Sequence, residues 1–249
     1  MAIMTGAEPF SHDGSEIGVL LCHGFTGTPQ SMRPWGEYLA ERGYTSRLPL
    51  LPGHGTTWQE MNRTRWADWY SCVDTAFREL HQTCERVVVC GLSMGAALTL
   101  QLAQEHGPRI SGLILINPAV KIEDPRTVLL PVLKHLVGSL AGVSNDIKRE
   151  GVTELAYTRT PLKAAHSQFA AWQSIIRDLP EVTQPVLLLR SPQDHVVPAS
   201  SSALVLSRIS SHDVTEILLE DSYHVATIDN DAPRIFDESA KFIERTTQT

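Results

Sequence analysis

The sequence lacks several features that would assign its class at once. No stretch of about 18 consecutive apolar residues is present that could cross a bilayer. Lysine and arginine form no runs and the formal net charge is −7, so we expect no nucleic-acid partner and no stable membrane insertion. The motifs HExxH, GxGxxG and GxxxxGKS/T are also absent, and we therefore predict neither a metal nor a nucleotide cofactor.

Cysteine is scarce, and the first residues have no secretory character. Cys22, Cys72, Cys84 and Cys90 show no close metal-type pairing, and in a chain this long they do not suggest a disulfide scaffold. Residues 1–14 have neither the basic start nor the apolar core of a secretory signal. We therefore expect reduced, buried thiols and a cytoplasmic protein.

The composition is that of an ordinary soluble globular protein, with 42% hydrophobic and 20% charged residues among 249. A chain of this length can form one large α/β core without splitting into domains. No internal repeat, low-complexity tract or linker divides the sequence. We therefore expect residues 1–249 to form a single domain whose partners are small neutral molecules.

Short β-branched or leucine-rich runs bounded by Gly, Pro or Asn predict buried parallel strands. Between the runs lie helical patterns, such as residues 29–43, where Thr28 suits a cap, Pro29 a first turn and Gly43 a stop. This alternation predicts the α/β class, with a mostly parallel central sheet flanked by helices and ligands at the carboxyl ends of its strands. The expected strands are residues 17–22, 86–91, 110–117, 186–190 and 215–220.

One segment, residues 119–179, breaks the alternation. It contains apolar helical stretches, including VLLPVLKHLVGSL and FAAWQSIIRDL, but no convincing strand. We expect an inserted helical cap or lid there, although the same helices could simply pack the core.

The sequence VVVCGLSMGAALTL, at residues 87–100, places a serine between an expected strand and an expected helix. At a sharp strand-to-helix turn, Ser93 would be lifted clear of the sheet, and Gly91 and Gly95 would leave room for the tight geometry. The Met94 N–H would lie at the helix N-terminus, where it could stabilise an oxyanion. This arrangement predicts a nucleophilic serine.

A nucleophilic serine needs a histidine base, and the base needs a carboxylate that orients it. In this architecture the chain order is serine, then acid, then histidine. His224 follows the last expected strand and is our candidate base, whereas His212 precedes that strand and should be solvated. Asp194, just past the strand at 186–190, is the favoured acid, with Asp221 as its competitor.

A second oxyanion donor is expected from the loop after the first long strand, in LLCHGFTGTPQ. His23 in this loop could suggest a metal or acid–base role. We favour a structural role, in which a glycine-containing turn directs the Phe25 N–H into the site and His23 supports the loop.

Motifs spread over nearly the whole chain resemble those of the bacterial carboxylesterase and monoacylglycerol lipase group of α/β-hydrolases. They are HGFTGTP, LPGHG at 51–55, GLSMG, TPLKA at 160–164, SPQDHVVP and the YHV of 223–225. The resemblance implies a serine esterase with a triad of Ser93, Asp194 and His224 and an oxyanion hole from the Phe25 and Met94 amides. The N-terminus is short for this family, so we expect an abbreviated first sheet edge.

These observations predict hydrolysis of medium- to long-chain carboxylic esters, especially monoacylglycerols, through an acyl-enzyme. An acyltransferase, a carbon–carbon hydrolase and a non-catalytic binding protein remain alternatives, because the fold alone does not define function. The preferred acyl length and the oligomeric state stay open.

The cap offers candidate substrate contacts. We expect two apolar helix faces, and with them an apolar tunnel above Ser93. The resemblance also makes Glu154 the counterpart of a cap glutamate that contacts glycerol hydroxyls, although it could equally be a solvated acid on a helix. The two apolar faces are Val128, Leu129, Leu130, Val132, Leu133 and Leu136 on one helix, and Trp172, Ile175 and Ile176 on another.

Overall fold

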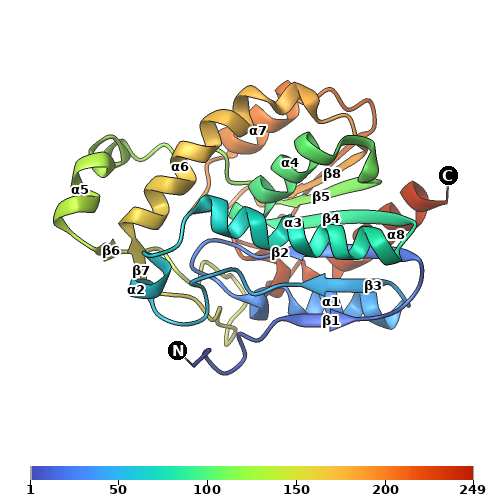
Figure 1. Ribbon diagram of the computed structural model, residues 1–249, viewed down its shortest axis with the longest axis horizontal. Helices are drawn as coiled ribbons and strands as arrows, with labels where there is room; N and C mark the ends of the chain where they lie inside the picture. The colour runs from blue at the N-terminus through green and yellow to red at the C-terminus, as the bar shows by residue number, and fades with distance from the viewer. Residues whose placement is uncertain (1, 249) are drawn as a thin grey trace.

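The computed structural model describes residues 2–248, except for the side chain of Arg126, and contains a seven-stranded sheet (Figure 1). The strand order is β1-β3-β2-β4-β5-β8-β9, and each neighbouring pair is parallel except β1 and β3. The strands are β1 Phe10–His12, β2 Ile17–Cys22, β3 Thr45–Leu48, β4 Arg86–Leu92, β5 Gly112–Ile116, β8 Val186–Arg190 and β9 Val214–Leu218. The predicted mostly parallel sheet is confirmed.

All five predicted strands are present, with ends that differ by up to two residues from the prediction. β1 and β3 were not predicted. Both are short, and the sequence of β3, Thr-Ser-Arg-Leu, has no apolar run to indicate a buried strand. β1 has three residues and forms the antiparallel edge of the sheet beside β3.

Helices cover both faces of the sheet (Figure 1). On one face, a core that includes Trp69 and Phe77 holds α3, α4, α6 and α7, and on the other a core that includes Trp35 and Phe242 holds α1 and α8. These helices are α1 Arg33–Glu41, α3 Trp66–Thr83, α4 Met94–His106, α6 Leu162–Arg177, α7 Ala199–Arg208 and α8 Ala232–Thr247.

The helix predicted at residues 29–43 begins with a 3-10 turn, η1 (Pro29–Ser31), which precedes α1. The Thr28 side chain caps this turn by accepting a hydrogen bond from the Gln30 N–H, as predicted. Gly43 follows the helix with φ of 84°, a left-handed conformation that glycine adopts without strain.

The segment between β5 and β8 forms the cap region. Its elements are η3 Pro125–Leu129, α5 Leu130–Leu136, β6 Ser139–Ala141, β7 Arg159–Pro161 and α6. The expectation that this segment contains no strand was wrong, because β6 and β7 pair antiparallel. Each has only three residues, and its partner lies about twenty residues away, so no local pattern indicates it.

The organisation of residues 1–249 as a single domain stays a prediction.

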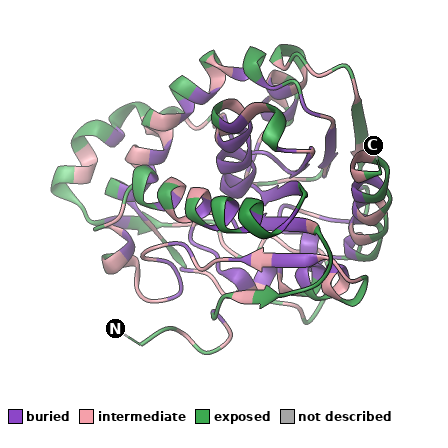
Figure 2. Cartoon of the chain, turned by 45° about the vertical axis from the view of Figure 1, so that its right-hand side comes forward, coloured by how far each residue is buried: buried purple, intermediate pink, exposed green. Residues whose placement is uncertain are grey.

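The first apolar cap face, on η3 and α5, does not turn inward as expected. Leu130 is buried and Leu133 partly buried against α6, through Leu162 and Ala165. The others are exposed to solvent, in a part of the cap that stands out beyond the sheet (Figures 1 and 2). The exposed fractions are 79% for Val128, 58% for Leu129, 63% for Val132 and 75% for Leu136.

The second apolar face, on α6, belongs to the main core. Trp172 and Ile175 are buried in the cluster that includes the strand residues Val87 and Leu113, and Ile176 packs against it. For α6, therefore, the alternative that a cap helix packs the core is correct.

The four cysteines are free thiols, and three of them are buried, whereas Cys72 is partly buried. Within residues 2–248, no helix combines the length and the apolar character needed to span a bilayer.

Candidate active site

The centre of the candidate site is the turn between β4 and α4. Ser93 lies there with φ 56° and ψ −116°, a strained backbone conformation for a residue other than glycine. A Cβ on Gly91 would lie 2.3 Å from the Gly95 oxygen, and a Cβ on Gly95 would lie 1.8 Å from the Cys22 oxygen. Both separations are impossible for real atoms, so the two glycines are required by the turn, as the sequence predicted.

Ser93 is less open than expected. The sequence predicted a serine lifted clear of the sheet, but only 8% of the surface of Ser93 is exposed. Its backbone joins neighbouring segments, since its N–H donates to the Ile116 oxygen at 2.9 Å and its oxygen accepts from the Ala119 N–H at 3.2 Å. The loop after β2 also lies close, because a Cβ on Gly24 would be 3.5 Å from the Ser93 Cβ.

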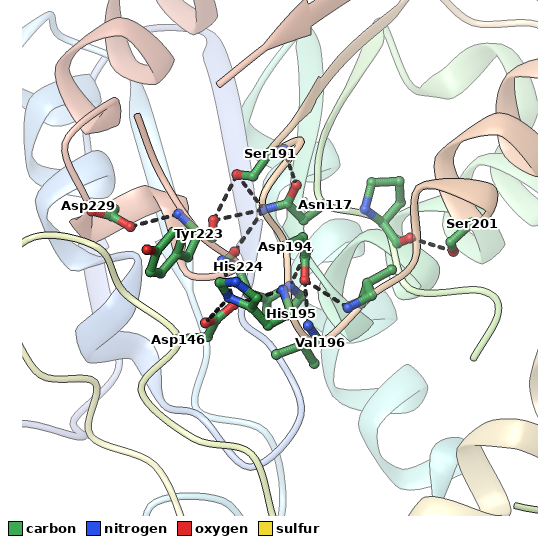
Figure 3. Close-up of polar contacts among 12 residues, drawn as sticks. Asn117, Asp146, Ser191, Asp194, His195, Val196, Ser201, Tyr223, His224 and Asp229 are labelled. Carbon is green, nitrogen blue, oxygen red and sulfur yellow. Dashed lines mark hydrogen bonds and ion pairs between the residues drawn. The ribbon is translucent and has the colours of Figure 1, made fainter. Parts of the chain in front are cut away.

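Asp194 and His224 come from different loops and meet in the structure (Figure 3). The distance from Asp194 Oδ2 to His224 Nδ1 is 2.7 Å, and both side chains are nearly inaccessible to solvent. The other carboxylate oxygen, Oδ1, accepts hydrogen bonds from the N–H groups of Val196 and Val197 at 2.8 and 2.7 Å. Three hydrogen bonds therefore hold the carboxylate in one orientation toward the imidazole.

The electrostatics of this pair favour an ionised acid and a basic imidazole. Burial alone would raise the pKa of Asp194, but the His224 charge, its hydrogen bond and the two backbone N–H donors outweigh burial and lower it. Burial alone would lower the pKa of His224, but Asp194, with help from the charges of Glu154 and Asp146, raises it above the usual 6.5.

The other candidates for the acid and the base make different contacts. The Asp221 side chain is 64% exposed and forms an ion pair with Lys148 Nζ at 2.8 Å. His212 is exposed, as expected. His195, next to Asp194 in the chain, pairs with Asp146, and its Nδ1 lies 2.8 Å from Asp146 Oδ1.

The loop after β2 is held by His23, which is fully buried. Its Nδ1 lies 3.0 Å from the Gly24 oxygen, and its Nε2 accepts from the Leu51 N–H at 3.2 Å. Burial lowers the pKa of His23 to about 4, so the ring is neutral at pH 7. These contacts fit a role in supporting the loop. Among residues 2–248, no group of three or more His, Cys, Asp or Glu side chains is arranged to hold a metal ion.

The two predicted oxyanion donors come from two segments close to Ser93. Met94 begins α4 directly after Ser93, and Phe25 follows Gly24 in the loop that approaches Ser93. Neither N–H donates a hydrogen bond to another of the residues that the structure describes. That these two amides form an oxyanion hole stays a prediction.

Asn117, which the sequence analysis missed, connects three loops of the site. It follows β5 with φ of 43° and accepts from the Ser191 N–H at 2.7 Å through Oδ1. Its Nδ2 donates to the His224 oxygen at 2.8 Å (Figure 3). A polar residue directly after the apolar strand GLILI was the available signal.

Glu154 lies in a non-helical part of the cap and is only partly exposed. Its carboxylate approaches the loop after β2, because a Cβ on Gly27 would lie 2.6 Å from Glu154 Oε1. Its charge also interacts with that of His224, and burial raises the pKa of Glu154 to about 7. The structure therefore places this carboxyl near the base rather than on a solvated helix.

The chain matches the family described as serine aminopeptidase, S33, over residues 15–231. It is 39% identical to the thermostable monoacylglycerol lipase of Bacillus sp. (strain H-257), over 98% of this chain and 96% of that protein. It is 27% identical to the carboxylesterase of Bacillus subtilis (strain 168), over 96% of each chain. The solved structure of a metagenome-derived lipolytic enzyme superposes with a TM-score of 0.95 at 41% identity, over 98% of this chain and 100% of that one.

The fold and these matches define the class of the protein as an α/β-hydrolase. Within that class, the chain belongs to the group of bacterial monoacylglycerol lipases and carboxylesterases, as the motif resemblance predicted.

Proposed function

We infer that this protein is a lipolytic serine hydrolase of carboxylic esters, and we propose that its preferred substrates are monoacylglycerols with medium to long acyl chains. The contact between Asp194 and His224, together with a serine at a strained strand-to-helix turn, is the observation that carries the proposal. The likeness to a monoacylglycerol lipase over almost the full chain supports the substrate class.

The proposed mechanism uses Ser93, His224 and Asp194 in the usual roles of a catalytic triad. The Ser93 hydroxyl attacks the ester carbonyl while His224 Nε2 takes its proton, and Asp194 keeps the proton of Nδ1 in place. The N–H groups of Phe25 and Met94 bind the oxyanion. His224 then protonates the leaving glycerol oxygen, and water, activated by the same imidazole, releases the fatty acid from Ser93.

The acyl side of the site is supported by a small apolar cluster in the cap. Leu130, Leu162 and Ala165 are buried together, and Phe169 and the oxyanion residue Phe25 pack against them. Apolar side chains beside Phe25 favour an acyl chain, since each buried methylene contributes up to about 0.8 kcal/mol. We therefore keep the prediction of an apolar acyl site above Ser93, lined by these residues rather than by the outer face of α5.

The alcohol side of the site is assigned to Glu154, whose carboxyl lies near His224 and the loop after β2. With a pKa of about 7, this carboxyl can accept a hydrogen bond from a glycerol hydroxyl when ionised and donate one when protonated. A glycerol ester offers two free hydroxyls at this position, whereas a methyl ester offers none.

A substrate panel tests the proposed function. Monoacylglycerols, p-nitrophenyl esters of increasing acyl length and an added alcohol acceptor should be compared before and after treatment with a serine-directed phosphonate. We expect hydrolysis to rise with acyl length, transfer to the alcohol to be minor, and mass spectrometry to locate the adduct on Ser93. Dominant acyl transfer, or inactivity toward all these esters, would favour the acyltransferase, carbon–carbon hydrolase or binding-protein alternatives.

The role of Glu154 is tested by Glu154→Leu and Glu154→Gln on a monoacylglycerol and on the methyl ester of the same acid. Hydrogen bonds to charged groups contribute roughly 1.5 to 3 kcal/mol, so Glu154→Leu should lower kcat/KM for the glycerol ester about 10- to 150-fold. The kcat/KM of Glu154→Gln for the glycerol ester should lie between those of Glu154→Leu and the wild type. An equal loss on both substrates, or none on either, removes Glu154 from the alcohol site.

The cytoplasmic location stays a prediction.

A further inference from the structure

Residues 145–149 of the cap contact both loops that carry the candidate acid and base (Figure 3). We call this segment the clasp. Within the clasp, Asp146 lies 78 residues before its partner His224, and Lys148 lies 81 residues before its partner Asp229. None of the clasp residues takes part in the proposed triad mechanism.

Asp146 is the central residue of the clasp. Its Oδ2 accepts hydrogen bonds from the N–H of His224 and the N–H of His195, each at 3.1 Å. Its Oδ1 lies 2.8 Å from the His195 ring Nδ1, and its own backbone oxygen accepts from the Val225 N–H at 3.1 Å. One carboxylate therefore binds the backbone of the base and the backbone next to the acid Asp194.

The position of these contacts distinguishes Asp146 from an ordinary surface acid. Its side chain is 11% exposed, whereas that of its partner His195 is 58% exposed. Hydrogen bonds from N–H groups to a carboxylate are among the stronger ones in proteins, and little water reaches these. The carboxylate thus joins the two loops that carry Asp194 and His224, whose side chains are 2.7 Å apart.

A second carboxylate holds the clasp to the His224 loop. Asp229 is fully buried, and its oxygens accept from the N–H groups of Lys148 and Arg149 in the clasp, both at 2.8 Å. They also accept from the N–H groups of Tyr223 and Asn230, at 2.9 and 2.8 Å. Asp229 therefore secures the clasp so that Asp146 is presented in a constant position.

We propose that Asp146 is a positioning residue for the hydrolytic reaction: from the cap, it sets the geometry between the base His224 and the acid Asp194. This inference rests on the triad of the proposed function. Asp146 acts through the backbone of His224 and through His195, so the proposed role is not contact with substrate.

Such a role predicts a specific kinetic effect. A small displacement of a catalytic group can reduce the rate by up to about 10²-fold, and His224 is needed both for formation and for hydrolysis of the acyl-enzyme. The loss should therefore fall on kcat, with KM nearly unchanged. The negative charge of Asp146 also helps to raise the pKa of His224, so its removal should shift the acidic limb of the pH profile to lower pH.

The experiment compares Asp146→Asn with wild type and with Asp221→Asn, using a methyl ester over a range of pH. Asp221→Asn is the matched control, because it removes the surface ion pair with Lys148 but none of the hydrogen bonds of Asp146. We expect Asp146→Asn to lower kcat about 10- to 100-fold and to move the acidic limb to lower pH. The control should keep the wild-type kcat and pH profile.

A folded Asp146→Asn variant with wild-type kcat and pH profile would overturn the proposal. If Asp146→Asn does not fold, His195→Ala serves in its place, since this exposed ring can be removed while the carboxylate keeps its backbone bonds. We expect a smaller, several-fold loss of kcat for His195→Ala, and an unchanged kcat would count against the role. Ser93→Ala separates the two hypotheses. If it stays active, the proposed function fails, whereas an inactive Ser93→Ala, combined with a wild-type kcat and pH profile for Asp146→Asn, contradicts only the positioning role.

Discussion

At the scale of single residues, the site combines a strained nucleophile with a tightly held acid. Ser93 keeps a backbone conformation that few residues other than glycine adopt, and the surrounding segments maintain it through hydrogen bonds from and to its backbone. Asp194 accepts three hydrogen bonds, so its carboxylate has little freedom to turn away from His224. The assignment of the triad depends on these individual contacts, and substitutions test it directly.

We predict that Ser93→Ala and His224→Ala each lower kcat on the order of 10⁶-fold, because the members of a triad act together. Asp194→Asn should lower kcat by a smaller factor. Asp221→Asn should remain active, since its side chain pairs with Lys148 rather than with the base. Steady-state kinetics on a soluble ester measure all four variants. An inactive Asp221→Asn together with an active Asp194→Asn would mean that the acid has been assigned to the wrong residue.

The pH dependence of activity follows from the same pair. His224 must be neutral to accept the serine proton, and its pKa is raised above the usual 6.5, so half-maximal kcat/KM should occur above pH 6.5. Below that point, activity should fall about tenfold per pH unit. The measurement should use a methyl ester, so that ionisation of Glu154 does not also change the binding of the alcohol. An acidic limb centred well below pH 6.5 would contradict a histidine stabilised by Asp194.

At the scale of secondary-structure elements, the cap has an inner and an outer apolar face with different surroundings. On the inner face, Phe169 of α6 and the oxyanion residue Phe25 both pack against the same buried cap cluster. The outer face, on α5, leaves Val132 and Leu136 mostly exposed, and neither belongs to the apolar cluster beside Phe25. Only the inner face is therefore expected to influence the acyl chain.

A matched pair of cap variants tests this division. Phe169→Asn should reduce the preference for a long-chain over an acetyl ester about tenfold, which corresponds to the loss of roughly two methylene contacts of ~0.8 kcal/mol each. Val132→Asn makes the same kind of change on the outer face and should leave the ratio of kcat/KM values unchanged. If both variants lower the ratio equally, or neither does, the acyl chain lies elsewhere.

At the scale of the whole molecule, the site lies where loops from separate strands of the sheet meet. The turn after β4, the loop after β8 and the loop after β9 supply Ser93, Asp194 and His224, and the cap adds the clasp. This location is the one expected for ligands in parallel α/β sheets. The proposed chemistry uses only groups of the chain itself.

Hydrolysis by the triad alone predicts that chelators have no effect. Activity measured before and after prolonged dialysis against EDTA should be the same, because the nucleophile, the base and the oxyanion donors are all protein groups. A strong loss that added zinc restores would overturn the expectation of a cofactor-free enzyme.

The sequence by itself determined those features that depend on local physical chemistry. The buried strands follow from apolar runs, and the turn at Ser93 follows from two glycines whose positions exclude any side chain. The alternation of apolar runs with helical patterns likewise predicted a mostly parallel sheet, which is observed. Ser93, Asp194 and His224 could therefore be proposed without a structure, and two of them were found in direct contact.

Only the tertiary structure decided which distant segments meet. The pairing of β6 with β7, the outward direction of α5 and the approach of Glu154 to the loop after β2 all depend on contacts between segments far apart in the chain. The same holds for Asp146, whose partners His195 and His224 lie 49 and 78 residues away. A local pattern reports only the burial and conformation of its own residues. The partners of a polar side chain are set by how the complete chain packs, because each buried donor and acceptor must find a hydrogen-bonding partner in the folded molecule.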